Sequence, residues 1–262
     1  MHLPSRSARC GFPIARDDRS AGHLLPSEES ASFLLWAWPQ VLGWPCTLNW
    51  LFSPVVGNST YPGDLWGIDS RGDLLIVETK LDRAGRPQDP LVDFVGYGSS
   101  KRTRELWTSV SLQARWHRLV EKEETFIREH SSRVDALARL CGTYPGVLPY
   151  SQHRDTVWRW QGLFRRRILP RFESGQYRRA IERGLRSRSE HDRPPTFIGV
   201  IATVVQTPPR LSRRGELSFR SLASKVGRSR VLLRALKVEP DHSNSIHLRS
   251  WTMPNVNGRG DR

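Results

Sequence analysis

The sequence predicts an α/β protein with a mixed central sheet that is flanked by helices and interrupted by a helical insertion. Two apolar segments, residues 64–69 and 73–80, surround a turn that contains Gly72, which is the pattern of an antiparallel hairpin. Residues 196–205 form a nearly continuous apolar run, as expected of a strand covered on both faces. Two segments of helical composition, 101–140 and 152–188, separate them, so the later strand can join the sheet parallel to the second hairpin strand.

At 262 residues the chain is long enough for one large or two small domains and can bury a substantial core, and one domain is expected over residues 25–253. The expected parts are a flexible basic arm (1–24), a core (25–100 and 194–253), a helical insertion (101–193) and a tail (254–262). The arm is assigned from its mixture of Ser, Arg, Gly and Pro, which shows no periodicity.

The charge predicts a polyanionic partner. The formal net charge is +15 and the pI is near 10.8, which favours nucleic acid and supplies affinity without sequence preference. Arginine greatly outnumbers lysine. This excess is consistent with bidentate phosphate contacts, and the base composition of the source genome would explain it equally well. The longest apolar stretch, near residues 32–44, contains Pro39 and is too short to span a bilayer, so no membrane partner is expected.

The cysteines indicate a reduced, cytoplasmic setting. Cys10, Cys46 and Cys141 are odd in number and lack Cys-x-x-Cys spacing, which predicts neither a disulfide framework nor a zinc site. The start of the chain contains Arg6 and Arg9 without an apolar core segment, unlike a secretory signal.

The first helix is expected to begin at Ser27, a favoured N-cap residue, and to be followed by a strand over 47–55. Its apolar residues recur at helical spacing, at Ala31, Leu34, Leu35 and Trp38. Pro39 disturbs the helix, and Gly43 is expected to end the next turn. Later strands are expected over 230–239 and 245–253.

The turn of the hairpin fixes which residues face one another. A three-residue loop with Gly72 in the left-handed region is favoured, because a two-residue loop requires positive φ at Ser70 and Arg71. The resulting register pairs Asp69 with Asp73, Trp66 with Ile76 and Asp64 with Glu78. Side chains alternate between faces, so Lys80 is expected on the face of Glu78.

Two opposed carboxylates, with Cβ atoms about 5 Å apart, destabilise a sheet unless a cation lies between them. Asp64 and Glu78 are therefore candidate metal ligands, and their hard oxygen atoms suit Mg²⁺. Lys80 is placed to orient or help deprotonate a metal-bound water, or to neutralise charge that develops on a phosphate. Alternating charges at an exposed sheet edge are the competing interpretation of the same residues.

Asp64, a hairpin, and Glu78-Thr79-Lys80 at the end of an apolar strand resemble the signature of the PD-(D/E)xK nuclease superfamily, whose fold is restriction-endonuclease-like. The closest resemblance is to its DNA-repair and uncharacterised bacterial branches, and it covers roughly residues 27–97. Gly63 precedes the first Asp, so the literal Pro-Asp is absent. The resemblance implies an endonuclease that hydrolyses phosphodiesters, with DNA as the expected substrate. The implied enzyme uses Mg²⁺, or alternatively Mn²⁺, which Asp64 and Glu78 would hold. Lys80 would be its water-orienting base.

The resemblance also implies a role for other residues. An acidic residue on the first helix often joins the metal site, and Glu28 is the preferred candidate; stabilisation of the helix dipole also explains it. Family members often carry Gln and Tyr four residues apart on the helix after the motif. Tyr97 matches and is a candidate DNA contact, whereas Asp93 departs from the pattern. Packing and solvation are the alternative roles of these two residues.

Arg165, Arg166 and Arg167 are candidate phosphate contacts within the helical region, although a solvated basic face has the same pattern.

Together, the motif, the charge and the resemblance predict a metal-dependent nuclease. The alternative is a non-catalytic basic nucleic-acid-binding or scaffolding protein in which the three charged residues are incidental or degenerate. A Mg²⁺-dependent cleavage assay distinguishes the two.

Overall fold

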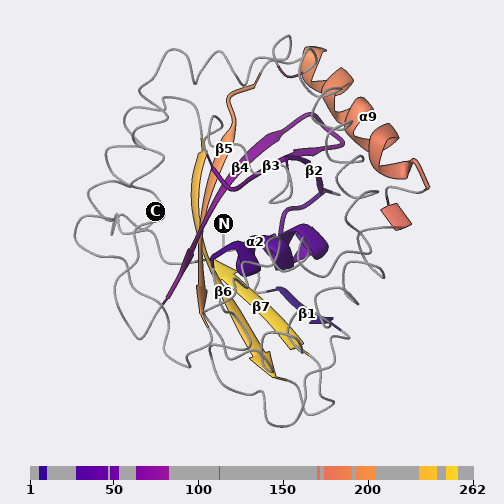
Figure 1. Ribbon diagram of the computed structural model, residues 1–262. Coiled ribbons are helices and arrows are strands. Elements are labelled where there is room, and N and C mark those ends of the chain that lie inside the picture. The colour runs from indigo at the N-terminus through magenta and orange to yellow at the C-terminus, as the bar shows by residue number, and fades with distance from the viewer. Residues whose placement is uncertain are drawn as a thin grey trace.

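The computed structural model describes residues 6–10, 28–46, 48–52, 63–82, 112, 170–171, 174–190, 193–203, 230–240 and 246–252. Within these residues, seven strands form one mixed sheet in the order β1-β7-β6-β5-β4-β3-β2 (Figure 1). The strands are β1 (Arg6–Cys10), β2 (Leu48–Phe52), β3 (Leu65–Asp69), β4 (Leu74–Leu81), β5 (Thr196–Thr203), β6 (Arg230–Pro240) and β7 (Ile246–Thr252). The helices are α2 (Glu28–Ala37), the 3-10 helix η1 (Pro39–Leu42) and α9 (Gln176–Glu190).

The three central strands β4, β5 and β6 are parallel, and the outer strands pair antiparallel. This arrangement confirms an α/β fold with a mixed sheet, and it confirms that the apolar run forms a strand parallel to β4. Phe197 and Ile201 alternate along β5 with Ile198 and Val200, and all four are buried. Both faces of β5 are therefore covered, as its continuous apolar sequence predicts.

Residues 6–10 correct the expectation of a wholly flexible arm, because they form β1 and pair with β7 from Arg6↔Ser250 to Cys10↔Ile246. The strand has no amphipathic pattern that sequence analysis can detect. It pairs through backbone groups, since the edge of β7 offers unpaired amides and carbonyls to any extended segment.

The hairpin has the predicted register and turn. The ladder between β3 and β4 includes Trp66↔Ile76 and ends at Leu65↔Val77. Gly72 has φ 80°, and its amide donates to the carbonyl of Asp69 at 3.0 Å. The amide of Asp69 donates to the carbonyl of Asp73 at 3.1 Å, which closes the strand pair beside the three-residue loop.

Helix α2 lies across one face of the sheet and contacts β4 (Figure 1). Its residues Ala31, Leu34 and Leu35 are fully buried in a core that includes Leu75 and Val77 of β4. Each fully buried leucine contributes about 1.5–3 kcal/mol, so this packing fixes α2 relative to the hairpin. The helix ends before η1, and Gly43 adopts φ 70° after η1, as the sequence predicts.

Helix α9 precedes β5 and contacts β2 and β3, along the edge of the sheet that contains the hairpin (Figure 1). It buries Tyr177, Ile181 and Leu185, and the Tyr177 hydroxyl donates to the carbonyl of Trp50. Helix α9 lies within residues 101–193, the region that the sequence predicts to be a helical insertion. No helix in the described segments is both long and apolar enough to cross a membrane.

Candidate active site at the open edge of β4

The site lies where β4 continues beyond the end of β3. The pairing of β3 stops opposite Val77, whereas β4 pairs with β5 as far as Leu81↔Ala202. In the part of the chain that the structure describes, residues 78–81 therefore have a strand neighbour on one side alone. Side chains from α2 and from the residue before β3 approach this open edge.

Lys80 connects the acidic groups of the site. Its Nζ lies 2.8 Å from Oε1 of Glu78 and 3.8 Å from Oε2 of Glu28, the first residue of α2. Glu78 is 5% exposed, whereas the side chain of Glu28 is 42% exposed. The structure thus brings together Glu28, Glu78 and Lys80, which sequence analysis selected from two separate segments.

Asp64 lies one residue before β3, and it corrects one detail of the predicted register. Its amide donates to the carbonyl of Val77 at 2.8 Å, so Asp64 is not a ladder partner of Glu78. Gly63 has φ 84° and turns the chain away at this point. The carboxylate of Asp64 instead accepts a hydrogen bond from the amide of Thr79 at 2.7 Å. That amide belongs to β4, beyond the end of its ladder with β3.

Two buried hydroxyl groups position Asp64, and sequence analysis did not select either of them. Ser32 of α2 donates from Oγ to Oγ1 of Thr79 at 3.1 Å. A hydrogen bond between the Thr79 hydroxyl and Asp64 lowers the pKa of the Asp64 carboxyl group. Ser32 is 2% exposed and Thr79 fully buried, so the chain Ser32–Thr79–Asp64 joins α2, β4 and the start of β3. The available signal was a polar residue within the apolar sequence of each element.

The electrostatic balance of the site leaves Asp64 costly to ionise. Its pKa is raised from 3.8 to about 6, and burial is the main cause. The Thr79 amide and Lys80 lower the pKa, and Glu28 contributes to raising it. Asp64 is therefore largely ionised at neutral pH, but at an energetic cost that an additional cation would reduce.

The donor chemistry at this edge fits a hard divalent cation. Mg²⁺ is commonly held by one or two carboxylates and completed by water and substrate phosphates. Asp64 and Glu78 would be the protein ligands, with Glu28 close to Lys80. Among the described residues, no group of three or more His, Cys, Asp or Glu side chains is arranged to hold a metal by itself. A cation here would therefore depend on ligands from the substrate or solvent.

The other candidate residues lie outside the described residues. They are Asp93, Tyr97, Arg165, Arg166 and Arg167.

Comparison with known proteins gives no relative for this chain. No family model matches it, and neither the curated proteins nor the solved structures that were searched contain a match.

Proposed function

We propose that the protein is a metal-dependent nuclease that hydrolyses phosphodiester bonds, with DNA as the substrate, and that its sheet is the core of a restriction-endonuclease-like fold. The observation that carries the proposal is the position of the Lys80 ammonium group, 2.8 Å from Glu78 and 3.8 Å from Glu28. Asp64 is held at the same edge of β4 by Thr79. A hairpin followed, after a helical crossover, by a parallel strand supports the fold.

Each residue has a distinct task in this reaction. Bound Mg²⁺ would polarise the scissile phosphate and lower the pKa of the attacking water. Asp64 and Glu78 would supply its carboxylate ligands, and the Thr79 amide fixes one of them in place. Lys80 holds its ammonium beside Glu78, where it can orient the water by hydrogen bonding and stabilise negative charge on the phosphate.

Cleavage of plasmid and single-stranded DNA with Mg²⁺ tests the proposal. The variants Glu78→Gln and Lys80→Ala should lower the cleavage rate by about a hundredfold or more, because each removes a group that contacts the reacting atoms. Gln40→Ala, at an exposed position of η1, is the control and should cleave like the wild type. Equal rates in all four proteins would refute the assignment of the site.

A second function, non-catalytic nucleic-acid binding, is supported by the ion pairs of Lys80. Its ammonium contacts Glu78 and Glu28, so these charges balance one another partly without a metal. If the wild-type protein binds DNA but cleaves it at no detectable rate with Mg²⁺ or Mn²⁺, this second function replaces the first.

A further inference from the structure

We infer that the outer face of α9 and the adjoining hairpin turn bind the phosphate backbone of nucleic acid. We call this region the α9 basic surface and define it by its five exposed arginines: Arg71, Arg179, Arg183, Arg186 and Arg193. The inference rests on the proposed function in naming nucleic acid as the ligand, but its test measures binding and not cleavage.

The two faces of α9 are sharply divided. Tyr177, Ile181 and Leu185 pack against the sheet, whereas Arg179, Arg183 and Arg186 recur on the exposed face. At 1.5 Å per residue, the three arginines span about 10 Å along the helix axis. Successive phosphates of one DNA strand are about 3.4 Å apart along the duplex axis, so this row spans about three intervals, or a run of about four phosphates.

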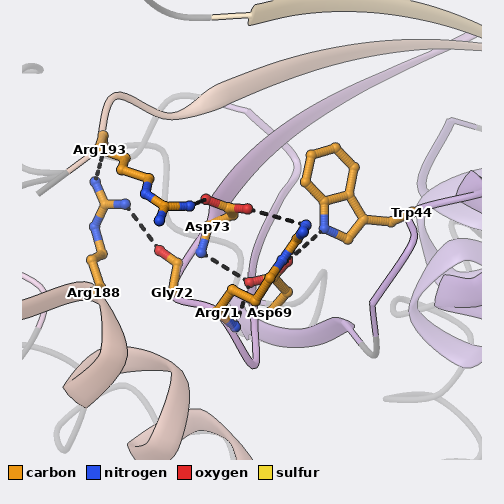
Figure 2. Close-up of polar contacts among 7 residues, drawn as sticks. All are labelled: Trp44, Asp69, Arg71, Gly72, Asp73, Arg188 and Arg193. Atoms are coloured by element: carbon orange, nitrogen blue, oxygen red, sulfur yellow. Dashed lines mark hydrogen bonds and ion pairs between the residues drawn. The ribbon is translucent and has the colours of Figure 1, made fainter. Parts of the chain in front are cut away.

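The hairpin turn is fastened to the end of α9 by Arg188, which is 1% exposed (Figure 2). Arg188 donates to the carbonyl of Gly72 at 3.2 Å and to that of Arg193 at 2.7 Å. A Cβ atom on Gly72 would lie 2.4 Å from the backbone nitrogen of Arg188, so only glycine allows this approach. The turn and residue 193 therefore lie beside the end of α9 and continue its surface.

Acidic residues hold the guanidinium groups of Arg71 and Arg193 in place (Figure 2). Arg71 lies 3.3 Å from Asp69 and 3.2 Å from Asp73, and Arg193 lies 3.2 Å from Asp73. Asp69 is fully buried and also accepts from the indole N–H of Trp44 at 2.8 Å. The two arginine side chains are still 51% and 52% exposed. Positioned guanidinium groups lose less entropy when they bind a phosphate, and their fork matches its geometry.

The chemistry of the surface favours nucleic acid over a lipid membrane. A helix that lies on a membrane inserts an apolar face, but the large apolar residues of α9 are packed against the sheet. Among the α9 residues whose side chains the structure describes, the exposed ones are Gln176 and the three arginines, and Glu182 between them is half-buried. Arginine is also the side chain best suited to bidentate phosphate contacts.

The surface lies at the opposite end of β4 from the candidate active site. Asp73 and Lys80 are seven residues apart along an extended segment, a separation of roughly 23 Å at 3.3 Å per residue. A duplex that reaches both regions must therefore extend at least about seven base pairs beyond the scissile bond. Cleavage of shorter substrates would gain nothing from α9.

Binding of a 20-base-pair DNA duplex, measured by fluorescence anisotropy in EDTA at several salt concentrations, tests the inference. The double variant Arg179→Gln/Arg183→Gln removes two charges from α9. The control Arg230→Gln/Lys237→Gln removes two charges from β6. We expect the α9 variant to lose about tenfold in affinity and to lower the salt slope by about two, with less than a twofold effect in the control.

Equal losses of DNA affinity in the two double variants, or no loss in either, would overturn the inference. It would also be overturned if the wild type bound phosphatidylserine vesicles more tightly than DNA and the α9 variant lost that vesicle binding. Melting temperatures that match the wild type ensure that lost affinity does not come from unfolding. Because EDTA prevents metal-dependent cleavage, failure of the nuclease proposal leaves this binding result unchanged. Failure of the α9 inference likewise leaves the cleavage assay intact.

Discussion

Replacement of Asp64 by Asn should stabilise the protein at neutral pH, although it removes a proposed metal ligand. In the folded protein the pKa of Asp64 is about 6, whereas the unfolded chain has a value near 3.8. Folding therefore favours the protonated form, and wild-type stability falls as the pH rises from about 4 to about 6. A difference of about two pKa units corresponds to about 3 kcal/mol, since each unit is worth about 1.4 kcal/mol.

Urea denaturation in EDTA between about pH 4 and pH 7.5 measures this effect. The free energy of unfolding of Asp64→Asn should match the wild type near pH 4 and exceed it by up to about 3 kcal/mol near pH 7.5. Glu182→Gln, at a half-buried position of α9, provides a control for the loss of one carboxylate and should show no such gain. Added Mg²⁺ should narrow the difference, because the ion stabilises only the protein that retains its carboxylate ligand.

Equal or lower stability of Asp64→Asn near pH 7.5 would refute the presence of an uncompensated buried charge at Asp64. That result would mean that solvent or another group already compensates the buried charge. The site would then lack the energetic cost that a cation is proposed to relieve.

Two further substitutions test the construction of the site and the turn. Gly72→Ala should lower the free energy of unfolding by about 2 kcal/mol or more, because φ is 80° and the new Cβ would meet the backbone of Arg188. Urea titrations measure this loss. A loss below about 0.5 kcal/mol would contradict the prediction. Thr79→Val removes the Thr79 hydroxyl, which accepts a hydrogen bond from Ser32. In the wild type this hydroxyl lowers the pKa of Asp64, so the substitution should raise that pKa. It should cost about 1 kcal/mol in stability and shift the acidic limb of the cleavage pH profile upward, and a downward shift would show that Thr79 does not support the carboxylate.

The hairpin was the most predictable part of the fold, because its geometry depends on local residues. Gly72 in a three-residue loop determines the register, and the ladder from Trp66↔Ile76 to Leu65↔Val77 follows from it. The continuous apolar sequence of β5 similarly predicted a strand that is buried on both faces. Local turn chemistry and hydrophobic pattern were sufficient in both cases.

The remaining features depend on tertiary contacts that no local pattern encodes. The position of Asp64 is set by Thr79 and by the turn at Gly63, which ends the ladder one residue before the expected pair. Ser32 reaches Thr79 only because α2 packs on β4, 47 residues away in sequence. The burial of Arg188 beneath the hairpin turn likewise requires α9 to dock beside it.

Binding of Mn²⁺ in the presence of a non-cleavable phosphorothioate duplex tests the central claim most directly. Electron paramagnetic resonance can count the bound ions in the wild type, in Asp64→Asn/Glu78→Gln and in the Glu182→Gln control. We predict saturable binding by the wild type and the control, and its loss in the double variant, because the two carboxylates are the proposed protein ligands. Undiminished binding by the double variant, or no binding by the wild type, would contradict a metal site at the open edge of β4.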